Sequence, residues 1–224
     1  MNQRASLYLI ILGVIGVSGA VFFLVPPTQG LGDKARLAFF HIPVAWVSVL
    51  AFVLSAFWAL CYLRTRRLDY DRKSAVAAGL GLVFCLLATS SGAIFAKITW
   101  GAYWNWDPRQ TSIFILLLLY GASLALRAAI NDIEQKAVIA AVYSLLSFLT
   151  MPFLIFIIPR YYFSLHPSPV INSAGKIDMD PVMLYTLTAA VVVATAIFRQ
   201  FFNYYVGRLR RQAHEQSGKR AGGY

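Results

Sequence analysis

The chain has 224 residues, of which 59% are hydrophobic and 13% are charged, and its mean hydropathy is +0.64. This composition excludes a water-soluble globular domain, because too few charged side chains are present to cover a surface that faces water. The sequence is therefore that of an integral membrane protein.

Six uncharged runs, taken in chain order, each approach the length of a membrane span. About 20 apolar residues in a helix cross the roughly 30 Å hydrocarbon core of a bilayer. The sequence predicts an all-α integral membrane protein, a single domain of six transmembrane helices at about 6–25, 38–63, 74–96, 109–127, 137–159 and 181–202, followed by a basic tail at 203–224. The first run exceeds the usual signal-peptide core of about 7–15 apolar residues, so we expect it to be retained. The tail is expected to be disordered beyond Gly207.

The distribution of Lys and Arg predicts which side each loop faces. With the N-terminus in the cytoplasm, the inner side holds 14 of the 20 basic residues and the outer side holds 6. Both termini are therefore predicted to be cytoplasmic (N-in/C-in), with short outer loops at 26–38, 97–110 and 160–180. The net charge of +11 then meets anionic lipid at the inner face, so membrane lipid, and not nucleic acid, is the expected partner of the basic residues.

The outer segment WGAYWNWDPRQT, residues 100–111, is the most informative part of the chain. Trp100, Trp104 and Trp106 lie within seven residues, together with Tyr103. One or two tryptophans are enough to anchor a segment at the lipid headgroups, whereas three indoles with a tyrosine suit a flat hydrophobic ligand. An aromatic belt without any ligand is the competing interpretation.

Two of the three histidines fall on the same predicted side as this segment. His41 lies at the outer end of the second span and His166 in the third outer loop, whereas His214 lies in the tail and is set aside. An iron porphyrin needs an aromatic surface, axial ligands such as histidine nitrogens, and cations for its propionates. Taken alone, His41 is also explained as an interface histidine bonded to a carbonyl, and His166 as an ordinary surface residue.

The haem hypothesis therefore depends on all three features occurring on one side. Arg109, Lys97 and Arg160 are the predicted partners of the propionates. Two neutral imidazoles on opposite sides of the iron leave no open coordination position, an arrangement that suits holding haem and does not suit oxygen chemistry.

Asp107 has two possible roles. In the dipeptide Asp107-Pro108 the carboxylate is placed as an N-cap and the proline as the first residue of the fourth span, and Asp180-Pro181 repeats this device at the sixth. A carboxylate near the iron site is also suited to holding a ligand histidine or Arg109 in place. The sequence does not separate these roles.

Other chemistries lack their motifs. Cys61 and Cys85 form no CxxC pair, which disfavours a disulfide and covalent haem attachment. No GxxxxGK[ST] sequence is present, so any ATP hydrolysis belongs to another subunit. The outer face carries no nucleophile with an acid-base partner, so no catalytic residue is predicted. A proton-coupled transporter would need charged groups near the bilayer midplane, and the predicted spans hold none there.

The tryptophan-rich segment resembles the WWD-domain signature of the haem-handling proteins of cytochrome c-type biogenesis. The pattern WGxxWxWDxRxT is matched at Trp100, Gly101, Trp104, Trp106, Asp107, Arg109 and Thr111. The chain length, the six spans, the signature between the third and fourth of them, and one histidine in each flanking outer region resemble the haem exporter protein C family of the cytochrome c maturation system.

This resemblance implies haem binding at the outer face of the bacterial inner membrane. The haem would be haem b, bound non-covalently, with His41 and His166 as its axial ligands. The platform for the porphyrin would comprise Trp100, Gly101, Tyr103, Trp104, Trp106, Asp107 and Arg109.

The resemblance also implies partners. These are an ABC-type ATPase subunit, a second membrane permease subunit, a small single-span membrane subunit, and a periplasmic haem chaperone to which the haem is presented. The alternative is a transmembrane permease subunit that translocates haem or another substrate, with the tryptophan segment only docking the chaperone.

Overall fold

The described chain is helical almost throughout. A computed structural model describes residues 3–28, 30–166 and 179–221. The long helices are α1 (Gln3–Phe23), α2 (Ala38–Thr65), α3 (Leu68–Trp100), α4 (Pro108–Ala129), α5 (Ile133–Pro152) and α7 (Pro181–Ala221). Three short elements complete the fold: the 3₁₀ helix η1 (Asp33–Leu37), the π-helical turn η2 (Phe153–Ile157) and the one-turn helix α6 (Ile158–Tyr161).

Six helical segments of the described chain are long and apolar enough to cross a membrane. These are Ala5–Phe23, Asp33–Thr65, Leu68–Trp100, Pro108–Ala129, Ile133–Tyr161 and Pro181–Ala213. The predicted all-α fold with six spans is therefore confirmed, while the orientation of the termini stays a prediction.

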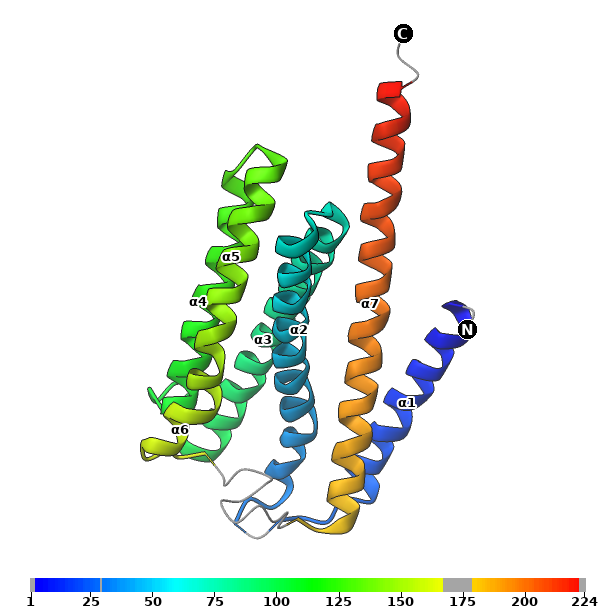
Figure 1. The fold of residues 1–224 in the computed structure, drawn as a ribbon. Coiled ribbons are helices and arrows are strands. Elements are labelled where there is room, and N and C mark those ends of the chain that lie inside the picture. The colour runs from blue at the N-terminus through cyan, green and yellow to red at the C-terminus, as the bar shows by residue number, and fades with distance from the viewer. Residues whose placement is uncertain (1–2, 29, 167–178, 222–224) are drawn as a thin grey trace.

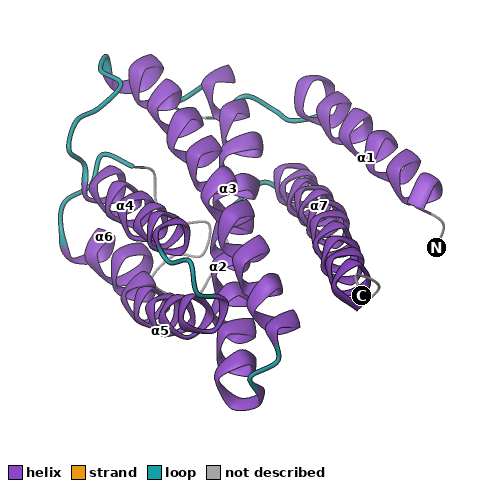
Figure 2. Cartoon of the chain, turned by 90° about the horizontal axis from the view of Figure 1, so that it is seen from above, coloured by secondary structure: helices purple, strands orange, loops and turns teal. Residues whose placement is uncertain are grey.

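The α2–α3 hairpin lies at the centre of the bundle (Figures 1 and 2). Helices α4, α5 and α6 cover one side of it, and α7 and α1 lie on the other. The small residues of α3 allow this close packing, because a Cβ on Gly81 would lie 2.6 Å from the Phe52 ring of α2. Phe52 in turn stacks on Tyr120 of α4, so one aromatic pair joins three helices.

Hydroxyl groups link α2 to both α3 and α5. Ser55 of α2 donates to the carbonyl of Ser74 on α3 and lies 3.1 Å from the hydroxyl of Ser144 on α5. All three serines are buried. In a membrane the lipid offers no hydrogen-bond partners, so such interhelical bonds satisfy polar groups that would otherwise be left unpaired.

The helix α3 begins before the predicted span, in a segment whose aspartates are paired. We expected the third span to begin at residue 74, because charged residues precede it, but α3 begins at Leu68. Asp71 accepts two hydrogen bonds from Arg127 of α4, at 2.6 and 2.8 Å. Asp69 accepts two from Arg210 of α7, both at 2.7 Å. These pairs connect the first turn of α3 to α4 and α7.

The expected disorder beyond Gly207 was wrong for residues 208–221, which continue α7. Arg208, Leu209, Arg210 and Arg211 are good helix formers, and no proline follows them. The paired Arg210 also holds this extension to the start of α3.

The segments predicted as outer loops meet at one end of the bundle, the lower end in Figure 1. We call this the loop end, and it carries the described residues 24–28, 30–37, 101–107 and 162–166. Helices α2, α4 and α7 begin there, and α1, α3 and α6 end there. Lys176 and most of the third outer loop lie outside the described residues.

Candidate functional site

The two histidines that were predicted as iron ligands come together at the loop end. His41 lies in the first turns of α2, and His166 lies in the segment that follows α6. Their ring centroids are 6.3 Å apart with an interplanar angle of 46°. Both side chains are partly buried. We call His41 and His166 the histidine pair.

His41 is held by the third helix. Its Nδ1 lies 3.1 Å from the hydroxyl oxygen of Ser91 on α3. Ser91 is buried, and the neighbouring Gly92 leaves the space that the imidazole ring fills. Sequence reasoning missed Ser91, because a serine within an apolar helix carries no functional signal of its own.

Asp107 is the N-cap of α4, and it also holds the segment that carries His166. Its Oδ1 accepts a hydrogen bond from the backbone N–H of Arg109 at 2.9 Å, which confirms the capping role. The same carboxylate accepts from Leu165 N at 2.7 Å and from the Ser164 hydroxyl at 3.1 Å. One buried side chain therefore caps α4 and also holds the segment that precedes His166.

Asp107 reaches His166 only indirectly. The distance from its Oδ1 to Nδ1 of His166 is 3.9 Å, which is too long for a hydrogen bond. Nδ1 of His166 is one of the buried side-chain atoms without a hydrogen-bond partner in the described part of the chain. The carboxylate thus positions the backbone around the histidine and leaves the ring nitrogen unpaired.

Electrostatics keep His166 neutral. Burial lowers its pKa to about 4, and the positive Arg109 and the nearby His41 act in the same direction, while Asp107 opposes them. At neutral pH the imidazole therefore carries a free lone pair, which is the form that binds a metal.

The aromatic residues divide into two groups. The Trp100 ring lies 5.4 Å from the His166 ring and packs edge-on against Phe95 at 5.7 Å. Trp104 instead packs perpendicular to Trp106 at 5.8 Å. Within the described residues, no ring contact joins Trp100 to either of these. The three tryptophans therefore do not form one continuous aromatic surface. Trp100 contacts His166, and Trp104 and Trp106 form a separate pair.

The backbone explains how the second group is presented. Trp106 has a left-handed φ of 56°, a conformation that is uncommon for a residue with a side chain, and 69% of its surface is exposed. Tyr103 is also exposed, with Lys97 over its ring. Gln110, which sequence reasoning missed, bonds to Asn105 N and Tyr103 O and so fixes this loop.

Gly101 ends α3. Its φ of 86° is left-handed, and its N–H donates to the carbonyl of Lys97 as a helix C-cap. The Lys97 ammonium donates back to the Gly101 carbonyl at 2.9 Å. Both residues are thus engaged in closing the helix, although each was predicted to serve haem.

Arg109 is the cation best placed for an anionic ligand. It is partly buried, it acts electrostatically on both histidines, and its Nε has no hydrogen-bond partner among the described residues. Arg160 is exposed and donates to the carbonyl of Phe156. Of the three cations proposed from the sequence, only Arg109 combines burial with an unpaired donor beside the histidine pair.

The spacing of the histidine pair fits a metal whose remaining ligands belong to a bound group and not to the protein. Bonds of about 2 Å from a metal to each imidazole nitrogen place the two ring centroids roughly 6 Å apart. No group of three or more His, Cys, Asp or Glu side chains suited to a metal ion occurs among the described residues. Two imidazoles are too few to hold a bare ion, whereas a porphyrin supplies four nitrogens itself.

Comparison with known proteins finds the same description for the matching family model and for the bacterial relatives. A family model described as "Heme exporter protein C" matches residues 2–220. A protein with that name from Bradyrhizobium diazoefficiens is 30% identical over 175 residues, which cover 78% of this chain and 66% of the relative. Its namesake from Escherichia coli K12 is 28% identical over 162 residues, or 72% of this chain and 64% of the relative.

A third relative is a mitochondrial protein of Marchantia polymorpha, named for cytochrome c biosynthesis. It is 27% identical over 169 residues, which cover 75% of this chain and 71% of the relative. The matches to the two bacterial relatives span just under two thirds of their lengths.

Proposed function

The chain belongs to the haem exporter protein C family, and on that premise we propose that it binds haem at its loop end and presents it to a haem chaperone. Membership of the family implies a role in haem handling for cytochrome c maturation, and the six apolar helices make the chain a multi-pass membrane protein. In this proposal haem b is the cargo, bound without a covalent link.

The observation that carries the proposal is the spacing of the histidine pair. His41 and His166 come from different helical hairpins, yet their ring centroids lie 6.3 Å apart, close to the separation that one shared metal atom requires. His166 is neutral at physiological pH, so its lone pair is available. We assign both residues as axial ligands.

The aromatic and cationic residues have separate tasks in this scheme. Trp100 contacts His166 and orients it, while the exposed Trp106, with Trp104 behind it, offers a surface for the porphyrin or for the docking chaperone. Arg109 supplies a charge-assisted hydrogen bond to a propionate. Asp107 keeps the His166 segment in register with α4.

The proposal includes an orientation and an assembly. The loop end would face the periplasm of a bacterial inner membrane, as the distribution of basic residues predicts. An ABC-type ATPase subunit, a second permease subunit and a small single-span subunit would complete the complex. With two imidazoles on the iron, the chain holds its cargo and carries out no chemistry on it.

The test is an absorption spectrum of the purified chain loaded with haem. We expect a six-coordinate, low-spin spectrum that is lost in His41→Ala and in His166→Ala. His214→Ala, a histidine of the C-terminal helix, is the matched control and should retain it. Unchanged spectra in both ligand variants would overturn bis-histidine ligation.

A further inference from the structure

Ser91 and Gly92, adjacent on α3, form a seat for the His41 imidazole. The Ser91 oxygen lies 3.1 Å from Nδ1 of His41. A Cβ on Gly92 would lie 3.0 Å from Cε1 and 3.5 Å from Nδ1 of the same ring. The ring is therefore held by a hydrogen bond on one residue and by close contact on the next.

The hydroxyl of Ser91 has only one proton to give. Its oxygen lies 2.7 Å from the carbonyl oxygen of Leu87 and 3.1 Å from that of Ala88, and both of these can only accept. Because the proton is donated to the helix backbone, the serine oxygen meets His41 as an acceptor. Nδ1 of His41 must then be the nitrogen that carries the hydrogen.

We infer that Ser91 is a positioning residue, which fixes His41 in the Nδ1–H tautomer so that Nε2 keeps the lone pair for iron. A hydrogen bond to the second ring nitrogen both orients a ligand histidine and raises its basicity. Gly92 supports this role, because any side chain there would push the ring away from the serine. The inference rests on the proposed haem function.

The two ligands are thus held in different ways. His41 is bonded through its own ring to a buried helical residue, whereas Nδ1 of His166 has no partner in the described chain. His166 is positioned through the backbone of its segment. Of the two histidines, His41 is the one whose tautomer is fixed by a side-chain acceptor.

The first experiment needs no haem. In the haem-free chain with ¹⁵N-labelled histidine, nitrogen NMR should show His41 as the Nδ1–H tautomer, with the signal assigned by its loss in His41→Ala. Ser91→Ala should give a mixture of tautomers and Ser91→Thr should restore one. An unchanged tautomer in Ser91→Ala would overturn the inference, whatever the outcome for haem.

The second experiment uses the haem-loaded chain. Ser91→Ala should weaken haem binding by about 10- to 100-fold, the usual effect of losing such a partner, and should raise the reduction potential of the iron. Gly92→Ala should weaken binding in the same direction. Ser48→Ala is the control, since Ser48 is a buried serine on α2 that donates to the carbonyl of Ala45 on its own helix.

These outcomes separate the two proposals. If His41→Ala abolishes the spectrum and Ser91→Ala binds haem as the wild type does, the positioning role fails and the haem function stands. If neither histidine variant alters the spectrum, bis-histidine ligation fails, and the NMR result still decides the tautomer.

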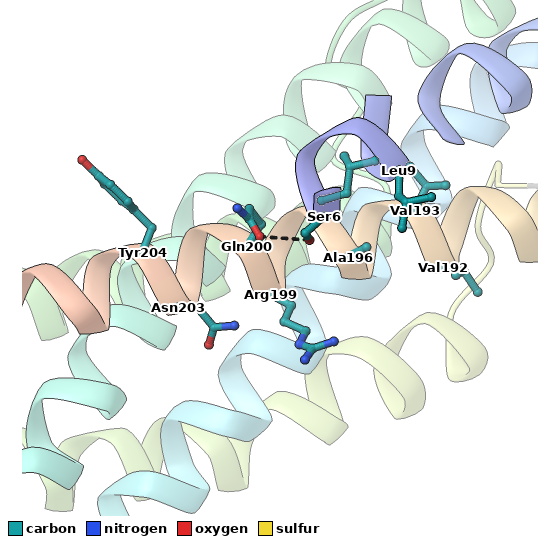
Figure 3. A pocket seen from close by; sticks show the side chains of 10 residues that line it. Ser6, Leu9, Val192, Val193, Ala196, Arg199, Gln200, Asn203 and Tyr204 are labelled. Atoms are coloured by element: carbon teal, nitrogen blue, oxygen red, sulfur yellow. Dashed lines mark hydrogen bonds between the residues drawn. The ribbon is translucent and has the colours of Figure 1, made fainter. Parts of the chain in front are cut away.

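An independent observation concerns the crevice between α1 and α7. A cavity of about 430 Å³ lies there, away from the histidine pair (Figure 3). It lies between the contact of Gly13 with Val193, where a Cβ would be 2.9 Å from the valine, and the hydrogen bond from Ser6 to Gln200. Only 6% of the α1 span is buried, so most of α1 is open to lipid.

The lining of the crevice changes from apolar to polar along its length. Leu9, Val192 and Ala196 form the apolar part of the lining. Arg199 and Asn203 line it one to two turns further along α7, at the predicted inner edge of the bilayer. No acidic residue is among the lining residues described. A phospholipid has the same order of chemistry, an acyl chain followed by a charged headgroup.

We propose that this crevice binds one anionic phospholipid, with its phosphate at Arg199 and an acyl chain between α1 and α7. Basic pockets between transmembrane helices at the cytoplasmic side favour anionic headgroups. The side chains of Gln200 and Asn203 are amides that donate further hydrogen bonds to such a group.

The test reconstitutes the full chain with phosphatidylglycerol or phosphatidylcholine and counts retained lipids by native mass spectrometry. The wild type should retain phosphatidylglycerol preferentially, Arg199→Gln should lower that retention about fivefold, and Arg208→Gln, an exposed arginine further along α7, should not. Ala196→Trp should exclude the lipid by filling the crevice. Equal retention of phosphatidylglycerol by the wild type and Arg199→Gln, or unchanged retention by Ala196→Trp, would overturn the proposal.

Discussion

The carboxylate of Asp107 accepts a hydrogen bond from the backbone N–H of Leu165 at 2.7 Å. This bond joins the N-cap of α4 to the residue that precedes His166. Asp107, the acidic residue of the tryptophan-rich segment, therefore positions the backbone next to His166, which is distant in the sequence. A charge-assisted hydrogen bond of this kind is shorter and stronger than one between neutral groups.

Replacing Asp107 by Ala should cost both stability and haem affinity. Loss of an N-cap destabilises a helix by about 0.5–2 kcal/mol, and the 164–166 segment loses its anchor as well. Thermal unfolding and haem titration measure the two effects. Asp180→Ala removes the corresponding cap of α7 and is the control, with a similar loss of stability expected and no loss of haem. Equal haem loss in both variants would mean that Asp107 is only a cap.

The pH dependence should reflect the lowered pKa of His166. Burial and the positive Arg109 bring the pKa to about 4, below the usual value near 6.5. Because the unfolded chain takes up this proton first, the stability of the haem-free protein should fall as the pH drops from about 6.5 to 4 and should not depend on His166 above that range.

Haem affinity should stay constant down to a lower pH than the stability of the haem-free protein does. Protons should compete with iron for His166 only as the pH approaches 4, so affinity should hold between pH 7 and 5. Arg109→Gln removes a positive neighbour, and its affinity should start to fall at a higher pH. Identical pH profiles for the wild type and this variant would contradict the assigned electrostatics.

The tryptophans should differ in what their removal costs. Trp106 is largely exposed, so Trp106→Ala should weaken haem retention or transfer with little effect on unfolding. Trp58 lies at the opposite end of the bundle, stacked on Tyr70 with the Lys73 ammonium over its ring, and Trp58→Ala should lower stability without affecting haem. Haem dissociation and thermal unfolding, measured on both variants, decide this. Equal haem losses would indicate general destabilisation.

The parts of the fold that could be predicted depend on local sequence. Long uncharged runs identify the spans, because a bilayer excludes unpaired charge wherever it occurs. The helix α3 itself begins earlier than the expected span, at Leu68, and its Asp69 and Asp71 are paired by arginines of α7 and α4. Such partners are distant in the sequence and leave no local pattern.

The site shows the same division. The signature and the two histidines were visible as residue types on one predicted side. The contact of Ser91 with His41 was not, because it depends on how α2 packs against α3. Trp100 is separated from Trp104 and Trp106 at the left-handed Gly101, where α3 ends, and Trp106 is itself left-handed; only the glycine is suggested by residue type.

The ion pairs at the end opposite the site should affect stability and leave haem untouched. Arg127→Gln leaves the Asp71 carboxylate buried without its partner, and loss of one member of a buried pair costs about 3–5 kcal/mol. Arg210 is half exposed in its pair with Asp69, so Arg210→Gln should cost less than about 1 kcal/mol. Unfolding in detergent measures the difference, and the haem spectrum of both folded variants should match the wild type. Similar losses in the two variants would mean that water reaches Asp71 and screens its charge as it does at the surface.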